Sequence, residues 1–229
     1  DDVTELVTAQ KHAAWSNVAR YMAHEIKNPL TPIKLSAQRL ENSFNKKNDQ
    51  QILRSCTETI KRQVNNIQTL VTEFSNFARM PESQFKIVKL SSILDTQINS
   101  IKVLDSKIKI IYENKFKDIK ISCDSNQLGR VFLNVLKNAY ESSSKKKKII
   151  LVNVEKESKN ISINFEDNGT GFLENRDKLF EPYITNKSNG TGLGLAICKK
   201  IIEDHNGEIN LLDSIKLGGA CVKIRLFKV

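Results

Sequence analysis

Three polar side chains suited to nucleophilic chemistry, those of His24, Glu25 and Asn28, lie within about one turn of a predicted helix. The apolar residues around them recur every three or four positions, which predicts a helix with one apolar stripe. His24 lies two positions from both Met22 and Ile26 of that stripe, so it points toward solvent, with Asn28 one turn further on the same side. A neutral imidazole there can act as a nucleophile while the Glu25 carboxylate orients it and accepts its proton. The stripe consists of Val18, Met22, Ile26, Leu30, Ile33, Ala37, Leu40 and Phe44.

A second group of residues, far along the chain, has the composition of a nucleotide site. Asp167 follows a predicted strand at 161–165, and the glycines after it let the backbone approach a planar base closely. A second glycine-rich segment leads into a predicted helix, and the unpaired amides at a helix start can bind phosphate. Each segment alone is also typical of an ordinary turn, so their order along the chain is what indicates a nucleotide site. The glycines are Gly169, Gly171, Gly190, Gly192 and Gly194.

Two amides on a predicted helix, Asn134 and Asn138, could complete such a site because they are four residues apart and share a helix face. Amide oxygens are suitable ligands for Mg²⁺ alongside phosphate oxygens, and we assign the metal to Asn138. An ordinary solvent-facing polar surface is the alternative, but the apolar residues between 131 and 136 favour a partly buried site. Residues 181–190 are expected to form a lid, with Lys187 a candidate phosphate contact.

Together these segments resemble the sequence boxes of sensor histidine kinases. Residues 24–30 resemble the histidine box, 127–139 the asparagine box, and 180–183 the phenylalanine box. The two glycine boxes correspond to 167–172 and 190–195, so the resemblance covers nearly the whole chain. The segments most similar to the NtrY branch, which is associated with nitrogen regulation, are 30–37, 180–187 and 201–205.

The resemblance implies an ATP-dependent protein kinase that phosphorylates its own His24 and passes the phosphoryl group to an aspartate on a response regulator receiver domain. Asp167 would then bind the exocyclic amine of adenine, and Asn138 would hold Mg²⁺. Related gyrase, MutL and chaperone ATPases place a water-activating glutamate where this chain has Asn134. Because an amide cannot act as that base, an ATP-hydrolysing clamp or chaperone is disfavoured.

Two further interpretations follow from the histidine box. A catalytically degenerate sensor or scaffold that only binds nucleotide is the alternative function, and the intact His24, Glu25 and glycine boxes argue against it. An amide at the position of Asn28 is typical of family members that also dephosphorylate their regulator, because it can orient a water molecule. Alternatively, Asn28 only supports the helix bend before Pro29.

The chain divides into two predicted domains. Residues 1–82 hold two long helical patterns and no glycine, whereas all nine glycines lie at or after Gly129. Two amphipathic helices cannot close a core alone, so a pair from each of two subunits is expected to form a four-helix bundle in a homodimer. Packing of this hairpin on the second domain is the alternative. We therefore predict a dimerisation and histidine phosphotransfer domain at 1–82, followed by a catalytic ATP-binding domain at 83–229.

The second domain alternates short apolar runs with helical patterns, which predicts a mixed sheet with helices on one face. The whole chain is thus of the α+β class: a helical hairpin that forms a dimeric bundle, then an α/β sandwich of the histidine kinase, gyrase and chaperone type. The hinge between them is expected at 80–83. Strands are predicted at 85–90, 108–112, 149–154, 161–165, 208–212 and 221–227, and helices at 91–101, 125–143 and 192–205.

Composition excludes several other classes. The net charge of +10 suggests nucleic acid, but the only dense basic run, 145–148, has no interleaved aromatic residues, so no direct nucleic-acid partner is expected. The four scattered cysteines have no metal or redox spacing and are expected to be reduced and buried. No apolar stretch reaches the ~20 residues of a membrane span. We expect a cytoplasmic fragment of a longer sensor.

Overall fold

The computed structural model describes residues 2–43, 50–78, 82–116, 118–143, 147–172, 175–185, 187 and 190–227. The side chains at 2–21, 43, 73 and 76–78 are outside this description, as are the predicted turn at 45–49 and residues 80 and 81 of the predicted hinge. The chain forms two compact units, one built on a helical hairpin and the other on residues 81–185 and 192–229. The proposed domain boundary at 82/83 stays a prediction.

The hairpin consists of α1 (Asp2–Ser43) and α2 (Gln50–Ala78). As the absence of glycine suggests, both helices are long, and α1 continues through Pro29 and Pro32. Met22, Cys56 and Leu70 are buried in this unit. Other apolar side chains of the hairpin stay largely exposed, so the two helices do not bury their apolar surface by themselves. These exposed side chains are Leu30, Leu35, Leu53, Val64 and Val71.

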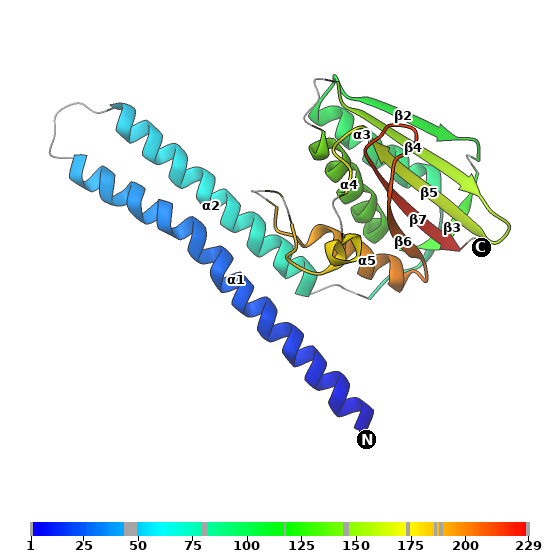
Figure 1. The fold of residues 1–229 in the computed structure, drawn as a ribbon, viewed down its shortest axis with the longest axis horizontal. Coiled ribbons are helices and arrows are strands. Elements are labelled where there is room, and N and C mark those ends of the chain that lie inside the picture. The colour runs from blue at the N-terminus through cyan, green and yellow to red at the C-terminus, as the bar shows by residue number, and fades with distance from the viewer. Residues whose placement is uncertain are drawn as a thin grey trace. The chain divides into compact units, whose positions relative to one another are not determined.

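The second unit has a five-stranded sheet in the order β2-β4-β5-β7-β6. β2 and β4 are parallel, and every other neighbouring pair is antiparallel. Three helices, α3, α4 and α5, cover one face of this sheet (Figure 1). The α+β fold class is confirmed. The bounds are α3 (Leu90–Leu104), β2 (Lys109–Asn114), α4 (Ser125–Ser142), β4 (Ile149–Lys156), β5 (Asn160–Asp167), α5 (Gly194–Asp204), β6 (Glu208–Asp213) and β7 (Ala220–Phe227).

The core lies between the sheet and the helices. Ile161, Ile163 and Phe165 alternate along β5 and are almost fully buried, and the Phe165 ring lies 5.7 Å from that of Phe132 on α4. Side chains two residues apart share a sheet face, so Asp167 continues this series at the end of β5. The strand therefore places a carboxylate on the side of the sheet that α4 covers.

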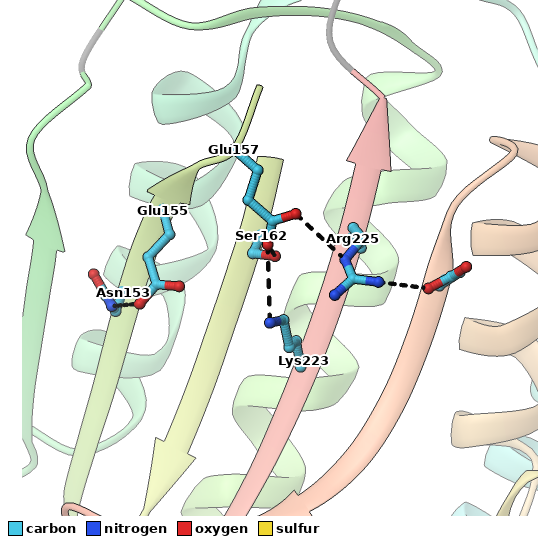
Figure 2. A network of polar contacts seen from close by, with 7 residues as sticks. Asn153, Glu155, Glu157, Ser162, Lys223 and Arg225 are labelled. Atoms are coloured by element: carbon cyan, nitrogen blue, oxygen red, sulfur yellow. Dashed lines mark hydrogen bonds and ion pairs between the residues drawn. The ribbon is translucent and has the colours of Figure 1, made fainter. Parts of the chain in front are cut away.

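The opposite face of the sheet is polar, and Figure 2 shows its main network. Glu157 accepts a hydrogen bond from Ser162 at 2.9 Å and lies 4.0 Å from Lys223 Nζ and 3.8 Å from Arg225 Nε. Arg225 also donates to Glu208 at 3.0 Å. Because these ion pairs are partly solvated, each contributes at most about 1 kcal/mol. They keep this face hydrophilic and confine the apolar core to the other side.

The strand predicted at 85–90 is present as β1 (Lys86–Lys89), but it lies outside the main sheet. It pairs with β3 (Lys120–Cys123) in a separate two-stranded sheet. The sequence prediction also missed β3, a four-residue strand with too few alternations to be conspicuous. It missed the 3-10 helix η1 (Arg176–Phe180) as well.

The expectation for the cysteines agrees with the structure. All four cysteines are free and buried: Cys56, Cys123, Cys198 and Cys221. Among the described residues, no helix is long and apolar enough to cross a membrane.

Candidate functional site

His24, Glu25 and Asn28 form an exposed polar cluster on α1. His24 Nδ1 lies 3.5 Å from Glu25 Oε1 and 3.4 Å from Asn28 Nδ2, and Asn28 Nδ2 donates to Glu25 Oε1 at 3.3 Å. The His24 side chain is 72% exposed, in agreement with its predicted position off the apolar stripe. The helical spacing thus brings all three predicted catalytic side chains together.

The geometry distinguishes the two ring nitrogens of His24. Glu25 and Asn28 both approach Nδ1, so the carboxylate can accept the Nδ1 proton while Asn28 donates to that same carboxylate. A proton held at Nδ1 leaves the lone pair on Nε2, at the other end of the ring. In the tautomer that the Glu25 contact favours, Nε2 is the atom that can act as a nucleophile.

Asp167 is a buried carboxylate at the end of β5, with 4% of its surface exposed. Its Oδ1 accepts hydrogen bonds from the backbone of Gly169 at 2.7 Å and of Ala220 at 3.2 Å. Since both bonds go to Oδ1, Oδ2 is the oxygen that can accept a hydrogen bond from a ligand amine. The backbone holds this carboxylate in one orientation.

Two glycines make room for this arrangement. Gly171 has φ +77°, which disfavours any side chain. Gly219 has an ordinary φ, but a Cβ there would lie 2.6 Å from Gly169 N and would also collide with Asp167. Gly169 and Gly171 are predicted from the sequence pattern, whereas Gly219 is not, although the adjacent pair Gly218-Gly219 was a visible signal.

Asn168 is a further residue that sequence reasoning missed. Its Oδ1 accepts from Ile149 N at 3.0 Å, and its Nδ2 donates to the Lys147 carbonyl at 2.9 Å. The buried amide therefore ties the loop after β5 to the start of β4. This bracing restricts the loop that carries Asp167 and Gly169.

Helix α4 carries the predicted amides Asn134 and Asn138, both half-buried. Ser142, one turn beyond Asn138 on the same helix face, lies so close to Gly169 that a Cβ on the glycine would meet its Oγ. This contact aligns the face of Asn138 with the Asp167 loop. Asn134 lies near Cys198: burial raises the pKa of that thiol to about 12, and a hydrogen bond with the Asn134 side chain partly opposes the rise.

The second glycine box has one glycine with a strict backbone requirement. Gly192 has φ +68°, its carbonyl accepts from Tyr183 N at 3.0 Å, and a Cβ on it would collide with the Tyr183 backbone. Gly194 is the first residue of α5 and is not crowded. Gly190 N donates to the Lys187 carbonyl at 3.1 Å in a local turn. Roles for Lys187 and Gly190 in phosphate binding stay predictions.

Both units match known families. Residues 123–229 match the Histidine kinase-, DNA gyrase B-, and HSP90-like ATPase family, and residues 14–83 match the His Kinase A (phospho-acceptor) domain. The sandwich is thus a nucleotide-binding ATPase fold, and the hairpin is a phospho-acceptor domain. Together they define the class: the chain belongs to the sensor histidine kinases.

Within this class, the relatives found are of the NtrY type. The chain is 39% identical to the nitrogen regulation protein NtrY of Azorhizobium caulinodans, over 99% of this chain and 30% of that protein. It is 38% identical to an NtrY-like sensor histidine kinase of Rickettsia bellii, over 96% of this chain and 37% of that protein. The chain therefore spans about a third of the length of these relatives.

Solved structures agree with the fold. The catalytic domain of histidine kinase ThkA has a TM-score of 0.57 and 26% identity, covering 63% of this chain and 96% of that one. ThkA in complex with the response regulator protein TrrA has a TM-score of 0.79 at 21% identity, covering 96% of this chain and 64% of that one. The second likeness supports the fold of the chain.

We predict that Asp167→Asn lowers the affinity for an ATP analogue about 5- to 150-fold, equivalent to about 1 to 3 kcal/mol. If the asparagine oxygen keeps the two backbone hydrogen bonds, its NH₂ group takes the place of Oδ2. Two hydrogen-bond donors, this NH₂ group and the adenine amine, then face each other. Calorimetry would measure the change. The control is Asp118→Asn, at an exposed carboxylate 2.9 Å from Lys89 Nζ. Unchanged affinity in Asp167→Asn would show that Asp167 has only a role in the turn.

Proposed function

We propose that this chain is the catalytic core of an ATP-dependent protein histidine kinase that phosphorylates His24 and transfers the phosphoryl group to an aspartate of a response regulator. The observation that carries the proposal is the pairing of two sites in one chain. A solvent-facing histidine with a carboxylate at Nδ1 lies in a phospho-acceptor domain, and a backbone-held Asp167 lies in an ATPase fold. The solved complex of ThkA with the response regulator protein TrrA supports a response regulator as the partner.

In this reaction His24 Nε2 forms a bond to the γ-phosphorus of ATP, and the bond from that phosphorus to the bridging oxygen breaks, releasing ADP. The positive charge that develops on the imidazole is relieved at Nδ1, where Glu25 lies 3.5 Å away and can take the proton. Asn28 holds the carboxylate at 3.3 Å. The Glu25 carboxylate is thus placed on the nitrogen that does not attack.

The nucleotide unit supplies binding and orientation. We assign the adenine amine to Asp167, with Gly169 and Gly171 forming the wall of the pocket. We assign the metal as Mg²⁺ that is coordinated mainly by the phosphates of ATP. The described residues contain no cluster of three or more carboxylate, histidine or cysteine ligands. Asn138 would hold this ion, which offsets phosphate charge when bound. Asn134 is an amide engaged with Cys198 rather than a base for water.

A homodimer is part of the proposal. The exposed apolar side chains Leu53, Val64 and Val71 are 11 and 7 residues apart, so they line one side of α2. A second hairpin would cover this stripe in a four-helix bundle. The phospho-acceptor family match of residues 14–83 is consistent with that arrangement.

His24→Gln is expected to abolish labelling of the purified chain by γ-labelled ATP, because the amide lacks the nucleophilic ring nitrogen. Nucleotide affinity should stay within twofold of wild type, since Asp167 belongs to the other unit. The label on wild type should be acid-labile, as a phosphoramidate is. Persistent labelling of the variant would refute His24 as the acceptor, and a wild type that binds ATP without labelling would favour a degenerate sensor.

Val64→Glu combined with Val71→Glu should convert the dimer to monomer at micromolar concentration, because neither charge could be paired in an apolar bundle core. Light scattering coupled to gel filtration would measure the mass. The matched control is Asn65→Glu with Thr72→Glu, which adds the same charges at exposed polar neighbours. A monomeric wild type would remove the bundle proposal.

We also propose a regulator phosphatase role for Asn28, because its amide is exposed on the same helix face as His24 and could orient water toward a phosphoaspartate. Asn28→Ala should still label His24, since Glu25 contacts Nδ1 directly, although loss of the Asn28 bond to Glu25 slows the labelling; loss of phosphate from the regulator should slow much more. Both rates can be followed with labelled protein. An Asn28→Ala variant that cannot label His24, or that dephosphorylates normally, would contradict separate roles.

A further inference from the structure

Ser83 and Gln84, a few residues after α2, are bound to the start of α4. Gln84 N donates to Asp124 Oδ2 at 3.0 Å, and Ser83 Oγ donates to Gln127 Oε1 at 2.9 Å. Phe85 follows, with its ring centroid 4.9 Å from that of His205. The segment 83–85 is therefore attached to the nucleotide-binding unit before β1 begins.

The two carboxylate oxygens of Asp124 accept hydrogen bonds from different segments. Oδ1 caps α4 by accepting from Asn126 N at 3.0 Å and Gln127 N at 3.1 Å, whereas Oδ2 accepts from Gln84. Burial raises the pKa of Asp124, but the backbone hydrogen bonds from Gln84, Gln127 and Asn126 outweigh it and the pKa is lowered. The stabilisation is therefore fully present above the unfolded pKa, and it is lost as pH falls through the lower folded value.

His205 completes this anchor from the end of α5. Its Nε2 accepts from Asp124 N at 3.0 Å, and its Nδ1 lies 2.8 Å from the Ile201 carbonyl. The two contacts together require a proton on Nδ1 and a lone pair on Nε2. The ring is buried, and it joins both helix ends to Phe85.

We propose that Asp124, His205 and Phe85 are positioning residues that set the length of the tether between the phospho-acceptor hairpin and the nucleotide-binding unit. From Ala78 to Ser83 there are five residue steps, which span at most about 18 Å. Without the anchor, the tether extends to Lys86 of β1, eight steps or about 29 Å. A longer tether lowers the effective concentration of the bound nucleotide near His24. Because this concentration falls as about the −3/2 power of tether length, the change from five to eight steps lowers it about twofold.

Gln84→Pro tests this directly, because it removes only the N–H that binds Asp124 Oδ2 and leaves the α4 cap intact. The preceding Ser83 is not helical, as a residue before proline requires. Gln84→Ala is the matched control, since it keeps the N–H. Phe85→Ala is the second variant, and it removes the ring contact with His205. Asp124→Asn is a third, because its single carbonyl oxygen cannot serve both the cap and Gln84.

Three readouts are needed: hydrogen exchange of segment 83–86, calorimetric affinity for an ATP analogue, and the rate of His24 labelling. Gln84→Pro and Phe85→Ala should speed exchange and lower kcat at least about twofold, while KM and nucleotide affinity stay unchanged. Unchanged exchange, or an unchanged kcat despite faster exchange, would overturn the proposal. A rise in KM alone would instead place the effect in the nucleotide site.

This inference rests on the proposed kinase function for its kinetic readout only. If the wild type does not label His24, the proposed function fails, whereas the exchange comparison of Gln84→Pro with Gln84→Ala still tests whether the anchor holds the segment. If wild type labels normally and both anchor variants match it in rate, the kinase stands and the tether proposal is wrong.

Discussion

The nucleotide-binding unit depends on the buried carboxylate of Asp167. A charge with 4% of its surface exposed must be hydrogen-bonded, and two backbone N–H groups, from Gly169 and Ala220, meet this need. For both to reach Oδ1, the β5 loop and the turn before β7 must approach so closely that Gly219 cannot carry a side chain. Glycine at positions 169 and 219 thus follows from a requirement to orient one carboxylate.

Helix α4 connects the functional parts of this unit along its length. Its first turn is capped by Asp124 and binds the segment after the hairpin. Its middle carries Asn134 and Asn138, and Ser142 in its last turn lies against Gly169. A helix is a regular, rigid element, so it fixes the spacing of these points within the unit.

In the hairpin, local helix geometry places the polar cluster, whereas in the other unit tertiary contacts place Asp167. The residues proposed for catalysis are neighbours in sequence, so one helical turn places His24, Glu25 and Asn28 together without help from other elements. The apolar surface of the hairpin is only partly buried, because residues such as Leu53 and Val64 stay exposed on the isolated hairpin. The polar cluster is thus encoded locally in α1, whereas the proposed second copy of the hairpin would cover the apolar side chains that stay exposed.

The sequence by itself determined what depends on short-range periodicity. It predicted both long helices, the outward direction of His24, the position of Asp167 at a strand end and most strands of the main sheet. Tertiary structure decided the pairing of β1 with β3, the crowding at Gly219, and the Asp124 contacts with Gln84 and His205, 40 and 81 residues away. Such contacts form only when distant segments pack, and a local sequence pattern does not identify the distant segment that it will contact.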